Sequence, residues 1–222
     1  MKNFRRIKRI ILFQKTCAHL LSALLHPLLM PTILFGTISL YAPIALTPLH
    51  TMSEKKNFVW VIFLSTFCLP FLLLSMYMTI RYKHINVKHF FMNDNKERVF
   101  PFLTTATFYS FVVYFMKKSS AFNDIVLLIM ILITLSIILI ALISHYWKIS
   151  AHSLSITGTI SLLFFIHKTT PDSALYYPII VMIVIAGLLM SARMYLNAHN
   201  LAQVCAGALT GLSLGIVAHL LS

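Results

Sequence analysis

The chain has 222 residues, of which 59% are hydrophobic and only 10% are charged, and its mean hydropathy is +0.87. A soluble domain carries about a quarter charged residues, so this composition excludes a soluble globular protein. Long apolar segments satisfy their backbone hydrogen bonds in lipid as helices or closed barrels. The sequence therefore predicts an all-α polytopic membrane protein, built as one helical bundle over residues 1–222.

The net charge is +13, from 18 Lys and Arg against 5 Asp and Glu. The basic residues are scattered through short segments between apolar runs, which is typical of membrane loops and predicts no nucleic-acid partner. The three cysteines are odd in number and form no CxxC pair, so we expect neither a disulfide framework nor a zinc site.

The chain begins with a basic segment, residues 1–16, which predicts an interfacial helix with its charges towards lipid headgroups. The first membrane span contains His26 and Pro27, and a proline there predicts a kink with freed backbone groups. His26 is expected to bond to that broken backbone, with membership of a functional site as the alternative. Seven spans are predicted, over about residues 17–46, 57–80, 99–116, 125–146, 149–166, 177–192 and 201–221.

The last predicted span carries glycines at every fourth residue, namely Gly207, Gly211 and Gly215. Small residues at this spacing lie on one face of a helix and allow another helix to approach closely. We interpret these glycines as a helix-packing face rather than as part of a functional site.

Seven spans place the loops 81–98, 145–150 and 192–200 on the same side as the N-terminus. That side carries 13 of the basic residues and the other side carries 5. The positive-inside rule then predicts a cytoplasmic N-terminus in a bacterial cytoplasmic membrane, without a cleaved signal peptide. A division of residues 10–46 into two passes would reverse this orientation.

The segment 191–203 contains Arg193 and His199, although ionisable side chains are costly beside apolar spans and therefore indicate function. His199 and Gln203 are four residues apart, so they share one face if helix has begun. Arg193 can approach His199 only if the chain bends between them. A cation and a histidine that converge at a helix junction predict an anion site.

This spacing resembles the third motif of the type 2 phosphatidic acid phosphatase superfamily, a family of membrane-bound lipid phosphatases. That motif reads Ser-Arg, five residues, His, three residues, Asp. Arg193 and His199 match it, Ser191 is displaced by one position, and Gln203 stands where the aspartate is expected.

Two earlier segments resemble the other motifs of the family, in the family's order. The segment Lys148–His152 is similar to the second motif, Pro-Ser-Gly-His, because Ser150 and His152 match it. The segment Lys96–Pro101 keeps the arginine, Arg98, and the proline of the first motif, Lys, six residues, Arg-Pro. It spaces them differently, and no lysine lies seven residues before the arginine.

The resemblance implies a metal-independent phosphatase, without a cofactor, that hydrolyses a lipid phosphate or diphosphate of the phosphatidate or polyprenyl type. His199 would attack phosphorus and form a phosphohistidine. His152 would protonate the leaving alcohol and then help to activate water. The phosphoryl oxygens would be held by Arg98, Arg193, Lys96, Lys148 and Ser150. The implied partners are this lipid phosphate and membrane lipids.

Gln203 departs from the third motif of that family, and the departure has chemical consequences. An aspartate would fix the tautomer of His199 and stabilise positive charge on its ring, whereas a glutamine carbonyl can only accept the ring proton. We therefore expect a weaker catalyst or a changed substrate. The alternative is an inactive lipid-phosphate binder or a small transporter.

Structural interpretations of the same residues remain open. His152 can be a buried helix-start histidine, and Arg193 can be an interface residue whose charged end reaches towards water. The acids Asp94 and Glu97 alone lie near each other and near the expected site, which favours a site without a magnesium cluster. The sequence leaves the particular lipid and the oligomeric state open.

Overall fold

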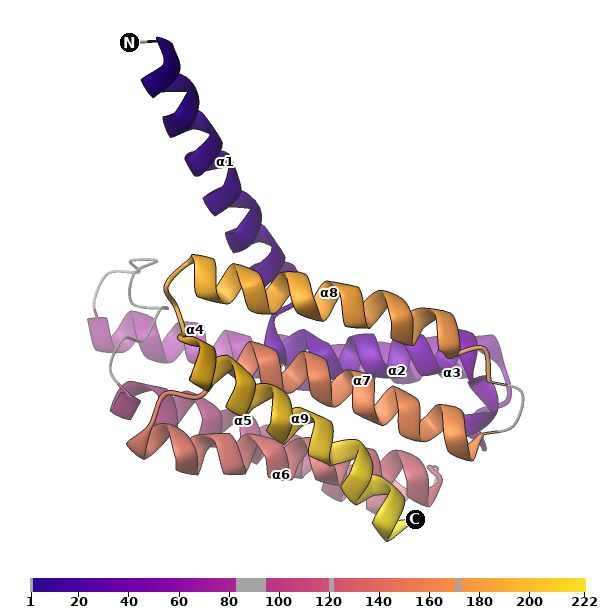
Figure 1. Ribbon diagram of the computed structural model, residues 1–222. Helices are drawn as coiled ribbons and strands as arrows, with labels where there is room; N and C mark the ends of the chain where they lie inside the picture. The colour runs from indigo at the N-terminus through magenta and orange to yellow at the C-terminus, as the bar shows by residue number, and fades with distance from the viewer. Residues whose placement is uncertain (1, 83–94, 120–121, 171–172) are drawn as a thin grey trace.

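The computed structural model is a bundle of helices (Figure 1) and describes residues 2–82, 95–119, 122–170 and 173–222, with side chains from residue 10 to 80 and from residue 98 onward within these ranges. The described residues contain no strand. The α-helices are α1 (Lys2–Leu24), α2 (Met30–Tyr41), α3 (Met52–Phe63), α4 (Leu69–Tyr82), α5 (Asn95–Ser119), α6 (Asp124–Tyr146), α7 (Ala151–Thr169), α8 (Tyr176–Tyr195) and α9 (Leu201–Leu221). Three short helical segments, η1 (Pro27–Leu29), η2 (Pro43–Leu46) and the π-helical η3 (Leu64–Cys68), join or interrupt them.

Six segments of the described chain are long and apolar enough to cross a membrane, so the predicted all-α membrane bundle is confirmed. The last five predicted spans coincide with α5 to α9 to within four residues at each end. Their starts follow from capping side chains: Asn123, Ser150 and Asn200 each accept a hydrogen bond from a backbone N–H in the first turn of α6, α7 and α9.

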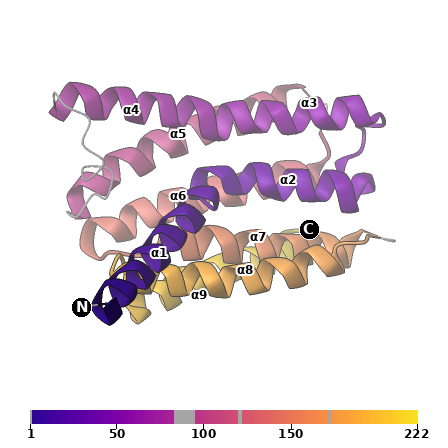
Figure 2. The same cartoon turned by 90° about the horizontal axis from the view of Figure 1, so that it is seen from above.

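The first span differs from the expectation, because α1 is one continuous helix from Lys2 to Leu24 and crosses the predicted boundary at residue 16. The helix ends where Pro27, which has no N–H, interrupts the backbone ladder. Nδ1 of His26 accepts a hydrogen bond from the N–H of Leu28 at 3.3 Å. The predicted kink and the bond of His26 to the broken backbone are therefore confirmed, and α1 leaves the bundle at a steep angle to α2 (Figures 1 and 2).

Helix α7 lies in the interior of the bundle and contacts α2, α6, α8 and α9. It is the predicted fifth span, but it is not among the six most apolar segments because it carries many Ser and Thr residues. Their hydroxyls donate to backbone carbonyls one turn earlier, as Thr159 does to Ser155 at 2.9 Å. Because neighbouring helices surround α7, this polar sequence is not exposed to lipid.

The glycine face of α9 packs directly on α7. Thr157 Oγ1 donates to the carbonyl of Ala208 at 3.0 Å, and Ser161 Oγ donates to the carbonyl of Gly211 at 2.9 Å. A Cβ atom on Gly211 would collide with Thr157 Oγ1 and with the Leu154 carbonyl. The interpretation of these glycines as a helix-packing face is confirmed.

Helices α4, α6 and α8 end at one end of the bundle, where α5, α7 and α9 begin (Figures 1 and 2). We call this end the junction end. It contains the short connections 147–150 and 196–200, which bring the candidate residues of the last two motifs to one place. Residues 83–94 lie outside the described chain.

Candidate functional site

The connection between α8 and α9 turns the chain back on itself at Asn197, which has a left-handed backbone with φ of 52°. The N–H of Ala198 donates to the carbonyl of Arg193 at 3.1 Å, and the N–H of Asn197 donates to that of Met194 at 2.9 Å. This pair of bonds is the Schellman motif that ends many helices. The bend that the spacing of Arg193 and His199 requires is therefore present.

Gln203 lies in the first turn of α9 and holds the ring of His199. Its Oε1 accepts from the backbone N–H of Asn200 at 3.3 Å, and the same oxygen lies 3.1 Å from His199 Nδ1. An amide oxygen can only accept hydrogen bonds, so Nδ1 of His199 carries the proton and Nε2 keeps its lone pair. The predicted contact between residues 199 and 203 is confirmed, with glutamine in the role of acceptor.

His152 is fixed from a different direction. Its Nε2 lies 3.1 Å from the carbonyl oxygen of Ser22 on α1. A carbonyl can only accept, so Nε2 carries the proton and Nδ1 is bare in the neutral ring. The ring also makes an edge contact with His26, at 5.9 Å between centroids. The broken first span therefore orients His152.

Two arginines lie beside these histidines, and neither has a carboxylate partner among the side chains that the structure describes. Arg193, in the last turn of α8, is 9% exposed, and its Nε has no hydrogen-bond partner among the described residues. Nη1 of Arg98, in the first turns of α5, is likewise buried and unpaired within the described chain. The two carboxylates among the described side chains, Glu54 and Asp124, belong to the first turns of α3 and α6 at the opposite end of the bundle.

The electrostatics of the cluster are strongly positive. The pKa of His199 is lowered to about 3, first by burial and then by the charges of Arg98, Arg193 and Lys148, while the bond to Gln203 opposes the shift. The pKa of Lys148 is lowered first by burial and then by the same two arginines. Cations crowded at a buried site repel one another unless an anion joins them, so the cluster favours a multiply charged anion.

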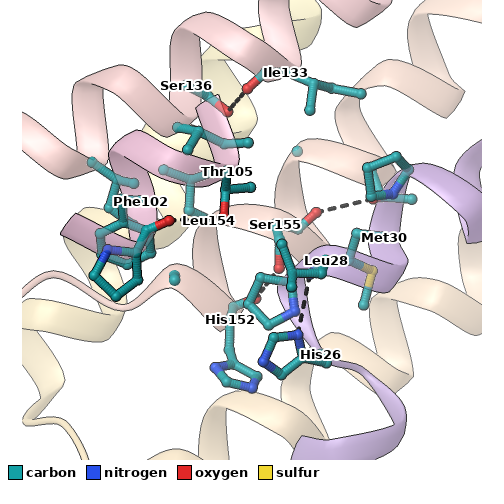
Figure 3. Close-up of a pocket in the computed structure, with 18 of the residues that line it drawn as sticks. His26, Leu28, Met30, Phe102, Thr105, Ile133, Ser136, His152, Leu154 and Ser155 are labelled. Carbon is teal, nitrogen blue, oxygen red and sulfur yellow. Dashed lines mark hydrogen bonds between the residues drawn. The ribbon is translucent and has the colours of Figure 1, made fainter. Parts of the chain in front are cut away.

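A cavity of about 750 Å³ begins at this cluster and extends into the bundle. Arg98, Arg193, His152 and His26 line its polar end, and apolar side chains of α2, α4, α5, α6 and α7 line the rest. Figure 3 shows His26 and His152 close together on its wall, on the broken first span and at the start of α7. The arrangement suits a ligand with an anionic end and an apolar body.

The structure thus brings together Arg98, Lys148, His152, Arg193, His199 and Gln203. Ser150 is fully buried and caps α7, where its Oγ accepts from both the N–H and the hydroxyl of Ser153. That role makes Ser150 a structural residue in the described contacts. The side chain of Lys96 lies outside the described residues.

Two further groups belong to the site, the ring of His26 and the carbonyl of Ser22. The His-Pro pair predicts the break at His26, where the side chain caps the next helical segment. The sequence contains no signal for the bond from Ser22 to His152, because it joins residues 130 positions apart.

No protein-family model, curated protein or solved structure matches the chain. Within the described part of the chain, no group of three or more His, Cys, Asp or Glu residues is placed to hold a metal ion. Fold and site together define an integral membrane protein of the polytopic α-helical class, with a buried cluster of cations and histidines at the mouth of an apolar cavity.

Proposed function

We propose that the protein is a phosphatase of the type 2 phosphatidic acid phosphatase kind, which hydrolyses a membrane lipid phosphate or diphosphate without a metal ion. The observation that carries the proposal is the pair of buried guanidinium groups of Arg98 and Arg193, which line an apolar cavity and whose Nη1 and Nε atoms, respectively, have no hydrogen-bond partner among the described residues. A phosphate dianion matches the positive charge and the free N–H donors, and a lipid tail matches the cavity.

The reaction would proceed in two balanced steps. Binding of the phosphate beside His152 favours uptake of a proton from solvent at its Nδ1. Nε2 of His199 then attacks phosphorus, the bond from phosphorus to the alkoxide oxygen breaks, and His152 gives that Nδ1 proton to the oxygen. Water then attacks the phosphohistidine, the N–P bond breaks, and His152 takes the proton that water loses. The Ser22 carbonyl holds the Nε2 proton throughout. Arg98, Arg193 and Lys148 stabilise the charge on the phosphoryl oxygens.

Phosphate release tests this proposal. Purified protein is assayed with a short-chain phosphatidate and a polyprenyl diphosphate in the presence of a chelator, together with His199→Ala and His152→Ala. Each variant is expected to lose at least about 100-fold in turnover, the usual scale for acid–base and nucleophilic groups. His219→Ala is the matched control, because His219 is exposed in the last turn of α9, far from the site. Parental turnover by folded His199→Ala would remove the phosphohistidine from the mechanism.

A second candidate is a lipid-phosphate binder without turnover, either a receptor or a small transporter. It is favoured by the burial of His199, which is 6% exposed and is not among the residues that line the cavity. Saturable binding of a lipid phosphate that Arg193→Gln abolishes, with no phosphate released, is the result expected of this candidate.

The orientation belongs to the same proposal. We place the junction end and the N-terminus in the cytoplasm of a bacterial cell, from the excess of basic residues on that side. Single cysteines are introduced by Tyr146→Cys at the junction end and Ser222→Cys at the C-terminus, after replacement of the three native cysteines; both positions are exposed. An impermeant thiol reagent on intact cells is expected to label position 222. Labelling of position 146 alone contradicts the orientation.

A further inference from the structure

The cavity follows the length of the helices that line it. On α5 its walls run from Arg98 at the mouth to Tyr109, eleven residues further, which is about 16 Å along an α-helix. On α7 they run from His152 to Leu162, or about 15 Å. The hydrocarbon core of a bilayer is about 30 Å thick, so one leaflet is about 15 Å deep. The cavity is therefore about as long as one lipid tail.

The composition of the walls fits such a tail. Protein interiors are close-packed, so a space of about 750 Å³ is far larger than an ordinary packing gap. Its volume lies within the range of about 300–1,000 Å³ of ligand sites. The deep part is lined by the apolar residues Leu34, Phe71, Ile133, Leu162 and Leu214.

Tyr109 is the lining residue of α5 that lies furthest from Arg98, at the deep end of the cavity. Its side chain is 1% exposed, and its hydroxyl donates to the carbonyl of Thr66 at 3.1 Å. Thr66 belongs to the π-helical turn η3, where the regular ladder of α3 and α4 is interrupted and a carbonyl can accept from outside the helix. The tyrosine ring is thus anchored at its tip and forms a fixed floor.

The cavity also reaches the outer surface of the bundle. Phe71 on α4 lines the cavity and is 46% exposed, and His19 on α1 lines it and is exposed as well. The cavity therefore borders the surroundings of the bundle beside Phe71 and His19. An apolar chain can enter there from the membrane without crossing water.

We infer that this cavity binds the hydrocarbon chain of a lipid phosphate along its length, with the phosphate at Arg98 and Arg193, and that Tyr109 limits the length of chain accepted. The identity of the anionic end rests on the proposed function. The chain site rests on the dimensions and lining of the cavity. Tyr109 is accordingly a specificity-determining residue that does not contact the reacting atoms.

Binding of n-alkylphosphonates tests the inference, because their C–P bond is not hydrolysed and binding is measured without turnover. Protein in nanodiscs receives phosphonates with chains of about 6 to 20 carbons at equal mole fraction in the bilayer, so that partition into lipid does not bias the comparison. Affinity is expected to peak at one chain length and to fall at least tenfold beyond it. Tyr109→Ala should move the peak to longer chains, whereas Tyr109→Phe should leave it in place.

Tyr114→Ala is the matched control, because Tyr114 lies on the same helix with its side chain 57% exposed. If Tyr109→Ala fails to fold, Leu162→Ala enlarges the same end of the cavity and is expected to move the peak in the same direction. Affinity independent of chain length, or a peak that a folded cavity variant leaves unmoved, overturns the inference. An affinity peak at one chain length without phosphate release contradicts the proposed phosphatase activity but supports the chain-binding cavity. Phosphate release without such a peak supports the phosphatase activity but contradicts the chain-binding cavity.

Discussion

The bond between Gln203 and His199 gives the sharpest test of the site. In Gln203→Leu, the side chain accepts neither the Nδ1 proton of His199 nor the N–H of Asn200. A buried donor left without an acceptor costs about 1–3 kcal/mol. The free ring of His199 turns away from the attacking orientation to regain a partner, and this free energy is then needed to return it. At about 1.36 kcal/mol for each factor of ten in rate, the expected loss in kcat/KM is about 5-fold to about 150-fold.

Gln203→Glu is expected to behave in the opposite way. Glutamate keeps the length of the side chain, so a carboxylate oxygen can accept from both N–H groups. Its negative charge strengthens both bonds and stabilises the positive charge that develops on the His199 ring during attack on phosphorus. Turnover is therefore expected to equal or exceed that of the parent, and the pKa of His199 is expected to rise from about 3.

Asn200→Ala separates ring orientation from stability of the helix start. It removes the cap that accepts from the N–H of Gln203 at 2.9 Å, at a cost of about 1 kcal/mol, and leaves the contact with His199 in place. Turnover and thermal unfolding are measured for all three variants. If folded Gln203→Leu matches the parent, or if Asn200→Ala loses as much activity, Gln203 does not orient the ring.

Three further expectations follow from the site and the packing. Arg193→Lys keeps the charge but loses the planar fork of donors, so kcat/KM should fall about tenfold or more in the phosphate-release assay, and a smaller loss would mean that charge alone suffices. The pKa of the His199 ring is about 3, so the ring should stay neutral from pH 4 to 8 in NMR titrations without substrate. Arg98→Ala removes a nearby positive charge and should raise that pKa. Titration of His199 near pH 6.5 in the parent would contradict these electrostatics. Gly211→Ala should destabilise the protein by about 1–3 kcal/mol in thermal unfolding, because its Cβ collides with α7. Gly187→Ala is the control: its Cβ meets nothing within 4 Å, so the stability should be unchanged or slightly higher.

Most of the fold could be predicted from the sequence because lipid-facing helices must be long and apolar. Helices α5 to α9 were predicted this way, and α7 was predicted despite its serines because its run of residues is long enough to span. The extent of α1 was not predicted. A basic surface segment and an apolar span both form helix, so composition changes at residue 16 while the backbone does not.

Part of the candidate site could also be predicted from the sequence, and part could not. The approach of Arg193 and His199 follows from local chemistry, since Asn197 tolerates a left-handed backbone and Asn200 is a good cap. Arg98 lies near His199 because α5 begins at the same end of the bundle as α9. The cavity and the floor at Tyr109 depend on how side chains of distant helices pack, and no periodicity in the sequence encodes that packing.

The break at Pro27 connects fold to chemistry. Because the helix ends there, the carbonyl of Ser22 is free to accept from His152, which leaves the Nδ1 of that ring available for proton transfer.

In Pro27→Ala, α1 should extend, and the N–H of His26 should donate to the Ser22 carbonyl in place of His152. Alanine favours a helix interior over proline by about 3 kcal/mol, so the variant should be at least as stable as the parent while turnover falls. Pro43→Ala, at the start of η2, is the matched control and should change neither the His152 ring nor turnover. The two measurements are thermal unfolding and phosphate release, with the tautomer of His152 read by NMR. A stable Pro27→Ala variant with parental turnover would show that the helix break does not orient His152.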